Sequence, residues 1–263
     1  MPRAAVLDNL RSMGESGALA RQPTPERKVT MGSRIARDVF LRRFRLERSY
    51  RPPALLRHPE WNHESPLDLV IARAMETRPG FAFLQVGGFD GQANDPIRPL
   101  VVGRGLPGVI VEPQRAAVEA LRKTYADYPQ VRILQAAVAD QDGERDFFTA
   151  EGGAIQFASF DRSHLLRHKI PASQIVCERV RCLTIASVLR EAGLERVDLI
   201  QIDAEGYDFE IIKTIDLATL RPAVIRYEHV HLSNEEADTS VALLASHGYR
   251  FISERRDLIA LQP

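Results

Sequence analysis

Three glycines, Gly87, Gly88 and Gly91, follow directly on a short apolar run of the sequence. Backbone amides at such a turn bind polar or anionic groups, and glycine lets a ligand approach the main chain closely. The next apolar run ends on Glu112, and an acid at that position can accept both hydroxyls of a ribose. Pro113 makes the following turn rigid. A tight turn and a surface carboxylate would each explain one feature, but together they favour a ligand that contains a ribose.

The third apolar run ends on small residues, at 136–139, and then on Asp140. Small side chains at a strand end leave room for a flat base, and Asp140 can accept a hydrogen bond from an exocyclic amine. A packed strand end would explain the same residues equally well.

Two further runs are followed by groups that can move protons or hold metals. Asp203 and Glu205 follow the fourth run, and Glu228, His229 and His231 follow the fifth. Acids near a helix start stabilise the helix by ~0.3–1 kcal/mol without any ligand, which would explain Glu205. Asp203 is nearer the strand and better placed to face a ligand. Two histidines and acids at one sheet edge predict a general base or a metal site.

These residues need a sheet to bring them together, and the sequence predicts one. Short apolar runs alternate with helical stretches, which is typical of an open, mostly parallel α/β sheet. The apolar runs, which we expect to be strands, lie at 82–86, 108–112, 131–136, 197–202, 223–227, 249–253 and 258–261. Helices are expected at about 66–78, 94–103, 114–126, 184–192, 206–214 and 234–247. The link between the last two runs is too short for a crossover helix, so these strands form an antiparallel hairpin.

A long segment, 137–196, interrupts this alternation. It contains two expected extra strands, at 145–149 and 176–182, and a polar stretch. On an α/β scaffold such an insertion is commonly an active-site lid, although a solvated surface excursion would have the same composition. The polar side chains expected to cover an acceptor are Ser159, Arg162, His164, Arg167 and His168.

The N-terminal part differs in composition from the rest. We expect residues 1–32 to form a disordered tail and residues 33–79 to form a helical arm. Met31 is an alternative start of the chain. Within the arm, 33–48 form a basic amphipathic helix that serves as a lid or packing arm, or else as a peripheral membrane or partner helix. Residues 1–58 hold thirteen Arg and Lys against five Asp and Glu, whereas the whole chain has a formal net charge of zero.

The composition excludes several classes of protein. Cys177 and Cys182 are the only cysteines, and they face opposite sides of an expected strand, so there is no disulfide framework. No apolar run approaches the ~20 residues of a membrane span, and the N-terminus lacks the apolar core of a signal peptide. These features predict a cytoplasmic protein.

Five stretches together resemble the FkbM-type S-adenosylmethionine-dependent methyltransferases. They are FLQVGGFDG, VIVEPQ, AAVAD, LIQIDAEGYDFEII and PAVIRYE, in that order, within about 80–253. The resemblance implies the class I methyltransferase fold, a Rossmann-like seven-stranded sheet flanked by helices, over 80–263. It also implies methyl transfer to a hydroxyl of a sugar, glycan or natural product. By position, Gly87, Gly88 and Gly91 match the glycine motif, Glu112 matches the ribose-binding acid, and Ala137 flanks the adenine.

The methionine end of the motif departs from the family. Members often have an acid two residues before the first glycine, where this chain has Gln85, and Phe89 stands where Asn is common. The contact to the methionine amino group is therefore expected from Asp90 or Asp203.

Transfer to an unactivated hydroxyl also requires removal of its proton. The expected base is Asp203 or His229, with Glu228 beside them. The alternative is a Mg²⁺ ion held by Asp203, Glu228 and His229, although histidine is an unusual ligand for Mg²⁺. Beyond that alternative we expect no metal.

Two other functions would share some of these features. An NAD(P)-dependent oxidoreductase would share the glycines and Glu112, but the turn after the first run reads Gly-Gly-Phe-Asp-Gly rather than G-x-G-x-x-G, and no Tyr-x-x-x-Lys pair occurs in the sequence. A non-catalytic binding module could grip nucleic acid through the basic arm. The balanced net charge argues against a nucleic-acid partner, and the oligomeric state is not predicted.

Overall fold

The computed structural model describes residues 65–93, 95–152, 155–254 and 256–262. The expected tail 1–32, the basic helix at 33–48 and the alternative start at Met31 all lie outside the described residues. Of the predicted helical arm 33–79, the described part is helix α4, Pro66–Thr77.

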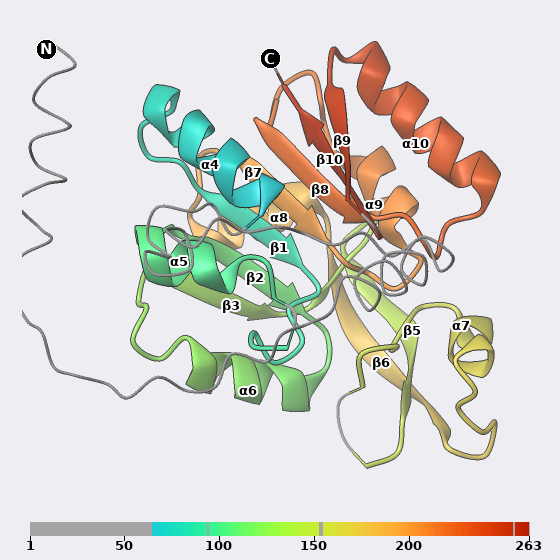
Figure 1. The fold of residues 1–263 in the computed structure, drawn as a ribbon. Coiled ribbons are helices and arrows are strands. Elements are labelled where there is room, and N and C mark those ends of the chain that lie inside the picture. Colours follow the sequence, from blue (N-terminus) through green and yellow to red (C-terminus); the bar gives the residue numbers. More distant parts are fainter. Residues whose placement is uncertain (1–64, 94, 153–154, 255, 263) are drawn as a thin grey trace, which may run out of the picture. The chain divides into compact units, whose positions relative to one another are not determined.

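A seven-stranded sheet forms the centre of the described chain (Figure 1). Its strand order is β3-β2-β1-β7-β8-β10-β9. β10 is antiparallel to both β8 and β9, and the other neighbours are parallel. The strands are β1 (Phe83–Val86), β2 (Gly108–Glu112), β3 (Val131–Gln135), β7 (Leu199–Ile202), β8 (Val224–Glu228), β9 (Arg250–Glu254) and β10 (Asp257–Leu261). The predicted α/β fold with an antiparallel final pair is confirmed.

Helices cover both faces of this sheet, because its strands bury alternate residues on opposite sides. Leu84 and Val86 of β1 belong to one apolar core, and Phe83 belongs to the other. The first core also contains residues of α8 (Ile185–Ala192), α9 (Asp208–Thr214) and α10 (Asn234–Ser246). The second contains residues of α4, α5 (Arg98–Arg104) and α6 (Arg115–Thr124).

Side-chain caps define where several helices begin. The hydroxyl of Ser65 accepts a hydrogen bond from the Asp68 amide at 3.1 Å and so caps the start of α4. Ser233 and Glu236 form a reciprocal capping box at the start of α10. The helix expected from 94 begins only at Arg98, because Asp95 accepts the Ile97 amide at 2.8 Å in a turn before it.

The insertion builds a small second sheet with the order β4-β6-β5. The strands are β4 (Ala137–Val138), β5 (Gly143–Ala150) and β6 (Ile175–Leu183), and a short helix, α7 (Arg162–Arg167), lies between β5 and β6 in the sequence. Both extra strands were predicted, but α7 was not. As expected, Cys177 is exposed and Cys182 is buried.

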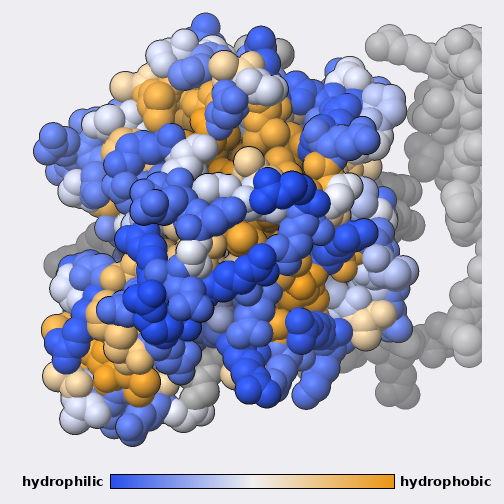
Figure 2. All heavy atoms as spheres, turned by 180° about the vertical axis from the view of Figure 1, so that it is seen from behind, coloured by the Kyte–Doolittle hydropathy of each residue, from blue (hydrophilic) through white to orange (hydrophobic). Residues whose placement is uncertain are grey.

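The second sheet has its own apolar core, which includes Ala137, Phe147 and Val180. Seen from behind, the lobe that it forms with α7 shows an apolar area among polar residues (Figure 2). Within the described part of the chain, no helix combines the length and apolarity that crossing a membrane requires.

Candidate active site

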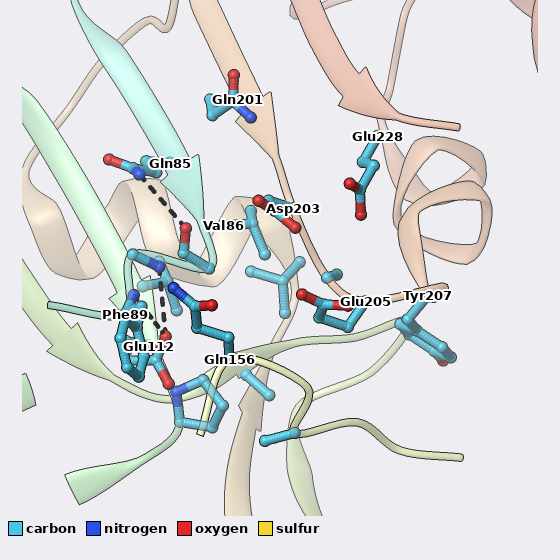
Figure 3. Close-up of a pocket in the computed structure, with 18 of the residues that line it drawn as sticks. Gln85, Val86, Phe89, Glu112, Gln156, Gln201, Asp203, Glu205, Tyr207 and Glu228 are labelled. Atoms are coloured by element: carbon cyan, nitrogen blue, oxygen red, sulfur yellow. Dashed lines mark hydrogen bonds between the residues drawn. The ribbon is translucent and has the colours of Figure 1, made fainter. Parts of the chain in front are cut away.

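A cavity of about 520 Å³ opens at the carboxyl ends of β1, β2, β7 and β8 (Figure 3). The strand order reverses between β1 and β7, and ligands of open α/β sheets bind at such a switch point. Of the residues predicted for a site, the described lining includes Gly87, Gly88, Glu112, Pro113, Ala137, Asp203 and Glu228. It does not include Asp90, Gly91 or His229.

The three glycines are required by close packing of the protein itself. Gly87 has a φ of +79°, and a Cβ atom there would lie 2.0 Å from the carbonyl oxygen of Asp203 on the neighbouring strand end. A Cβ atom on Gly88 would lie 2.4 Å from the side chain of Ile110. Gly91 has a φ of +67°, and its Cβ atom would lie 2.7 Å from the ring of Tyr125, just after α6. Gly91 therefore lets α6 pack closely against the turn.

Glu112 lies at the end of β2, on the cavity wall and almost fully buried. Its Oε2 atom accepts hydrogen bonds from the amides of Gly88 at 3.3 Å and Phe89 at 3.1 Å (Figure 3). Its Oε1 atom accepts the amide of Gln114 at 3.0 Å. Burial raises the pKa of this carboxyl, and the three amides oppose that shift. Glu112 therefore anchors the glycine turn to β2.

Gln85 stands where the resemblance places the contact to the methionine amino group. Its amide nitrogen donates to the carbonyl of Gly87 at 3.3 Å and to Asp95 at 3.2 Å. Its Oε1 atom is buried and has no hydrogen-bond partner among the described residues. Asp90 instead accepts the amides of Gln92 and Ala93, both at 2.9 Å, so its carboxylate closes a local turn.

Next to Ala137, apolar side chains of the insertion complete the wall of the cavity. Phe147 from β5 lines it together with Ile155 and Phe157. Asp140, considered as a partner for an exocyclic amine, is not among the described lining residues and lies 3.5 Å from Arg145 in an exposed ion pair.

Three carboxyls, Asp203, Glu205 and Glu228, gather at the other end of the cavity (Figure 3). Asp203 is exposed at the cavity surface, but protein atoms around it remove part of its hydration. This desolvation, together with the nearby negative charge of Glu205, raises its pKa to about 6. Burial and the carboxylates of Asp203 and Glu205 raise the pKa of Glu228 to about 7.

Of the two histidines after β8, His231 rather than His229 contacts these carboxyls. His231 Nε2 lies 3.3 Å from Glu228 and 3.4 Å from Glu205. Glu228 is also paired with Arg256 at 2.8 Å. The ring nitrogen Nε2 of His229 is buried and has no partner among the described residues. The described carboxyls close enough to share an ion are Asp203, Glu205 and Glu228, so the structure does not assemble the set with His229 that was considered for Mg²⁺.

Two histidines of the insertion also reach this end of the site. His164 Nε2 lies 3.1 Å from Glu205 Oε2, and the rings of His164 and His168 are 4.6 Å apart. Burial lowers the pKa of His168 and of His231, which favours neutral imidazoles. The spacing of four residues between His164 and His168 was the only sequence signal for this pairing, since it places both on one side of a helical turn.

Comparison with known proteins identifies the family. The profile of the methyltransferase FkbM domain matches residues 85–251, which is more than half of the chain. No curated protein has a sequence that matches this chain.

Solved structures that resemble the chain are distant. Methyltransferase FkbM from Methylobacillus flagellatus KT has 13% identity and a TM-score of 0.45, over 68% of this chain and 43% of that chain. The O-methyltransferase from Bacillus cereus, solved in complex with SAH, has 13% identity and a TM-score of 0.39, over 87% of this chain and 97% of that one. The similarity to these structures is remote, and the domain match over residues 85–251 defines the family. The chain belongs to the FkbM family of S-adenosylmethionine-dependent methyltransferases.

Proposed function

We propose that this protein transfers a methyl group from S-adenosylmethionine to a hydroxyl of a sugar, glycan or other natural product. The observation that carries the proposal is the state of Asp203. Its carboxylate lines the cavity past the end of β7 and makes no hydrogen bond with the described residues, whereas Glu228 and Glu112 are both engaged.

The residues at the glycine turn fit the cofactor. Glu112 stands where ribose hydroxyls can donate to it, and Ala137 and Phe147 offer an apolar slot for the adenine. The unpartnered Oε1 atom of Gln85 can accept a hydrogen bond from the methionine ammonium, which the sequence had led us to expect from Asp90 or Asp203. When bound, S-adenosylmethionine supplies a methyl group activated by its sulfonium.

The acceptor end then has to orient a hydroxyl and take its proton. We assign the base to Asp203, since it is free to accept the proton while facing the cavity. His229 is not among the described residues that line the cavity, so we do not propose it as the base. The Mg²⁺ site considered above needs His229 as a ligand, and we do not propose that site either. Glu228, fixed by Arg256 at 2.8 Å, can accept a hydrogen bond from a second hydroxyl.

The polarity of this end favours a hydroxylated acceptor. Glu205, Tyr207 and Arg226 line it together with the two other carboxyls. Such a wall offers several hydrogen-bond donors and acceptors to a sugar-like molecule, and it would be poorly matched to an apolar one. No specific observation favours the oxidoreductase or the nucleic-acid-binding alternative.

Calorimetric titration with S-adenosylmethionine tests the cofactor, with NAD as a parallel ligand. We expect the wild type to bind S-adenosylmethionine alone, and Glu112→Ala to bind it about tenfold more weakly or worse, which corresponds to ~1.4 kcal/mol. Screening hydroxylated acceptors for release of S-adenosylhomocysteine then tests the reaction. Binding of NAD, or of neither ligand, by the folded protein would contradict the proposal.

A further inference from the structure

The acceptor end of the cavity adjoins a second cluster of side chains that the proposed methyl transfer does not use. It consists of His164, His168, Glu205 and His231, hereafter the three-histidine cluster. Each residue offers one ligand atom, and these atoms all lie within 4.8 Å of one another.

We propose that the three-histidine cluster binds a zinc-class divalent transition metal ion and thereby fastens the insertion to the edge of the main sheet. Three imidazoles and one carboxylate form a ligand set that suits Zn²⁺ and its neighbours better than Mg²⁺ or Ca²⁺. Four protein ligands without an open position are typical of a structural site. The inference does not rest on the methyltransferase reaction.

The distances support a tetrahedral site. Zn–N and Zn–O bonds of ~2.0–2.2 Å place neighbouring ligand atoms about 3.4 Å apart. Glu205 Oε2 lies 3.1 Å from His164 Nε2 and 3.4 Å from His231 Nε2, so these two separations are already close to that spacing. The widest separation in the cluster is at most 4.8 Å, and closing it requires about 1.4 Å of side-chain movement.

The ligands come from three segments that are far apart in the sequence. His164 and His168 lie one helical turn apart, in α7 and at its C-cap. Glu205 follows β7, and His231 follows β8. An ion held by all four would therefore link the insertion to two strand ends of the main sheet, much as a crosslink would.

Neighbouring contacts hold the ligands in place. The ring of His168 is stacked on Phe157 with centroids 4.1 Å apart. The hydroxyl of Ser159 donates to the carbonyl of Glu205 at 3.3 Å. Glu205 itself has a φ of +50°, which costs energy for a residue with a side chain and aims this carboxylate at the imidazoles. His164 is only 1% exposed.

The competing carboxylate set, Asp203, Glu205 and Glu228, shares one residue with the cluster. A set made only of oxygen ligands would prefer Mg²⁺ or Ca²⁺. The two sets therefore differ in both the metal that they select and the residues on which binding depends.

The test uses the full chain, without a histidine tag, after metal removal by a chelator and dialysis. Zn²⁺ is titrated in competition with a chromophoric chelator, and Co²⁺ is added separately to record its visible spectrum. We expect one Zn²⁺ per chain, a tetrahedral Co²⁺ spectrum, and at least ~100-fold weaker binding in His164→Ala and in His168→Ala, since even partners outside the ligand shell are worth about 10–100-fold.

Two histidines outside the cluster provide matched controls. His247→Ala, at the end of α10, and His229→Ala should both bind Zn²⁺ as the wild type does. Circular dichroism checks folding, and if the buried His164 cannot be replaced, the partly exposed His168 decides the result. Failure of the wild type to bind Zn²⁺, equal affinity in folded His168→Ala, or binding of Mg²⁺ alone would overturn the inference. A cluster held only by hydrogen bonds would give the first of these outcomes.

Discussion

At the scale of single residues, the carboxyls of the cavity differ in how far the protein already engages them. Glu112 accepts three backbone amides, Glu228 pairs with Arg256, and Glu205 contacts His164. Asp203 alone among them has neither a hydrogen bond nor an ion pair to its carboxylate within the described chain. A base must be free to receive a proton from its substrate, so the absence of such a partner separates its role from those of its neighbours.

Asp203→Asn should therefore remove activity while leaving the fold intact. We expect kcat for methyl transfer to fall about 10²-fold or more, because a positioned base contributes roughly 10²–10⁴-fold. The melting temperature should stay close to that of the wild type, since no hydrogen bond to a described residue is lost. Asp238→Asn, which changes an exposed carboxyl on α10, serves as the matched control and should leave kcat unchanged. An unaltered kcat in Asp203→Asn would assign the base elsewhere.

At the scale of elements, the glycine turn shows how packing and binding are combined in one segment. The turn follows β1, and its glycines touch the end of β7, the side chain of Ile110 on β2, and the end of α6. The amides of Gly88 and Phe89 in this turn donate hydrogen bonds to Glu112. The turn thus sets the positions of three strands and a helix around the cavity, whatever ligand occupies it.

Gly91→Ala should consequently lower stability rather than cofactor affinity alone. The left-handed backbone costs an alanine about 1–2 kcal/mol, and the overlap of its Cβ atom with Tyr125 and Leu121 adds about 1–3 kcal/mol. Denaturant unfolding should show a loss of about 2–5 kcal/mol. Gly103→Ala, inside α5 and with open space at its Cβ position, is the matched control and should gain about 0.5–1 kcal/mol. Equal stability of the two variants would mean that the turn can adapt.

Elements that bury an apolar run were predictable, and short polar ones were not. All seven strands of the main sheet were expected. The central strands β1, β2 and β7 are buried on both faces between two helical layers, so their sequences are continuous apolar runs, and the edge strands still carry short apolar runs. The helix α7 has six residues in a polar stretch, so its sequence carries no clear periodicity. Its position depends on contacts with distant residues such as Glu205.

The site was predictable where a residue follows a strand directly. Glu112, Asp203 and Glu228 lie at or next to strand ends, and their positions follow from the sheet. His229 and His231 are only two residues apart in the turn after β8, and the sequence offered no means to decide which of them faces the carboxyls. That choice depends on the backbone of the turn, where the His229 amide donates to the carbonyl of Arg256 at 2.9 Å.

At the scale of the whole molecule, the insertion and the main sheet act as one wall around the cavity. Arg145 of β5 donates to the Tyr207 hydroxyl at 2.7 Å, and its guanidinium lies 4.6 Å from the centre of the Phe160 ring. Phe160 in turn contacts the Tyr207 ring edge-on, with centroids 4.9 Å apart. Through this group the small sheet is held against the start of α9, so the cavity is closed on the side of the insertion.

The described cavity residues all lie between Gln85 and Asp257, and the family match covers 85–251. Every described residue belongs to the compact unit Asn62–Pro263. A protein that begins at Asn62 should therefore fold and bind S-adenosylmethionine within about threefold of the full chain, a difference of ~0.7 kcal/mol or less. Calorimetry on both proteins measures this, with circular dichroism as the check on folding.

A folded but tenfold weaker binder would show that residues 1–61 contribute to the cofactor site. Unchanged binding together with lost methyl transfer to a soluble acceptor would instead place their contribution at the acceptor end, as expected of a lid.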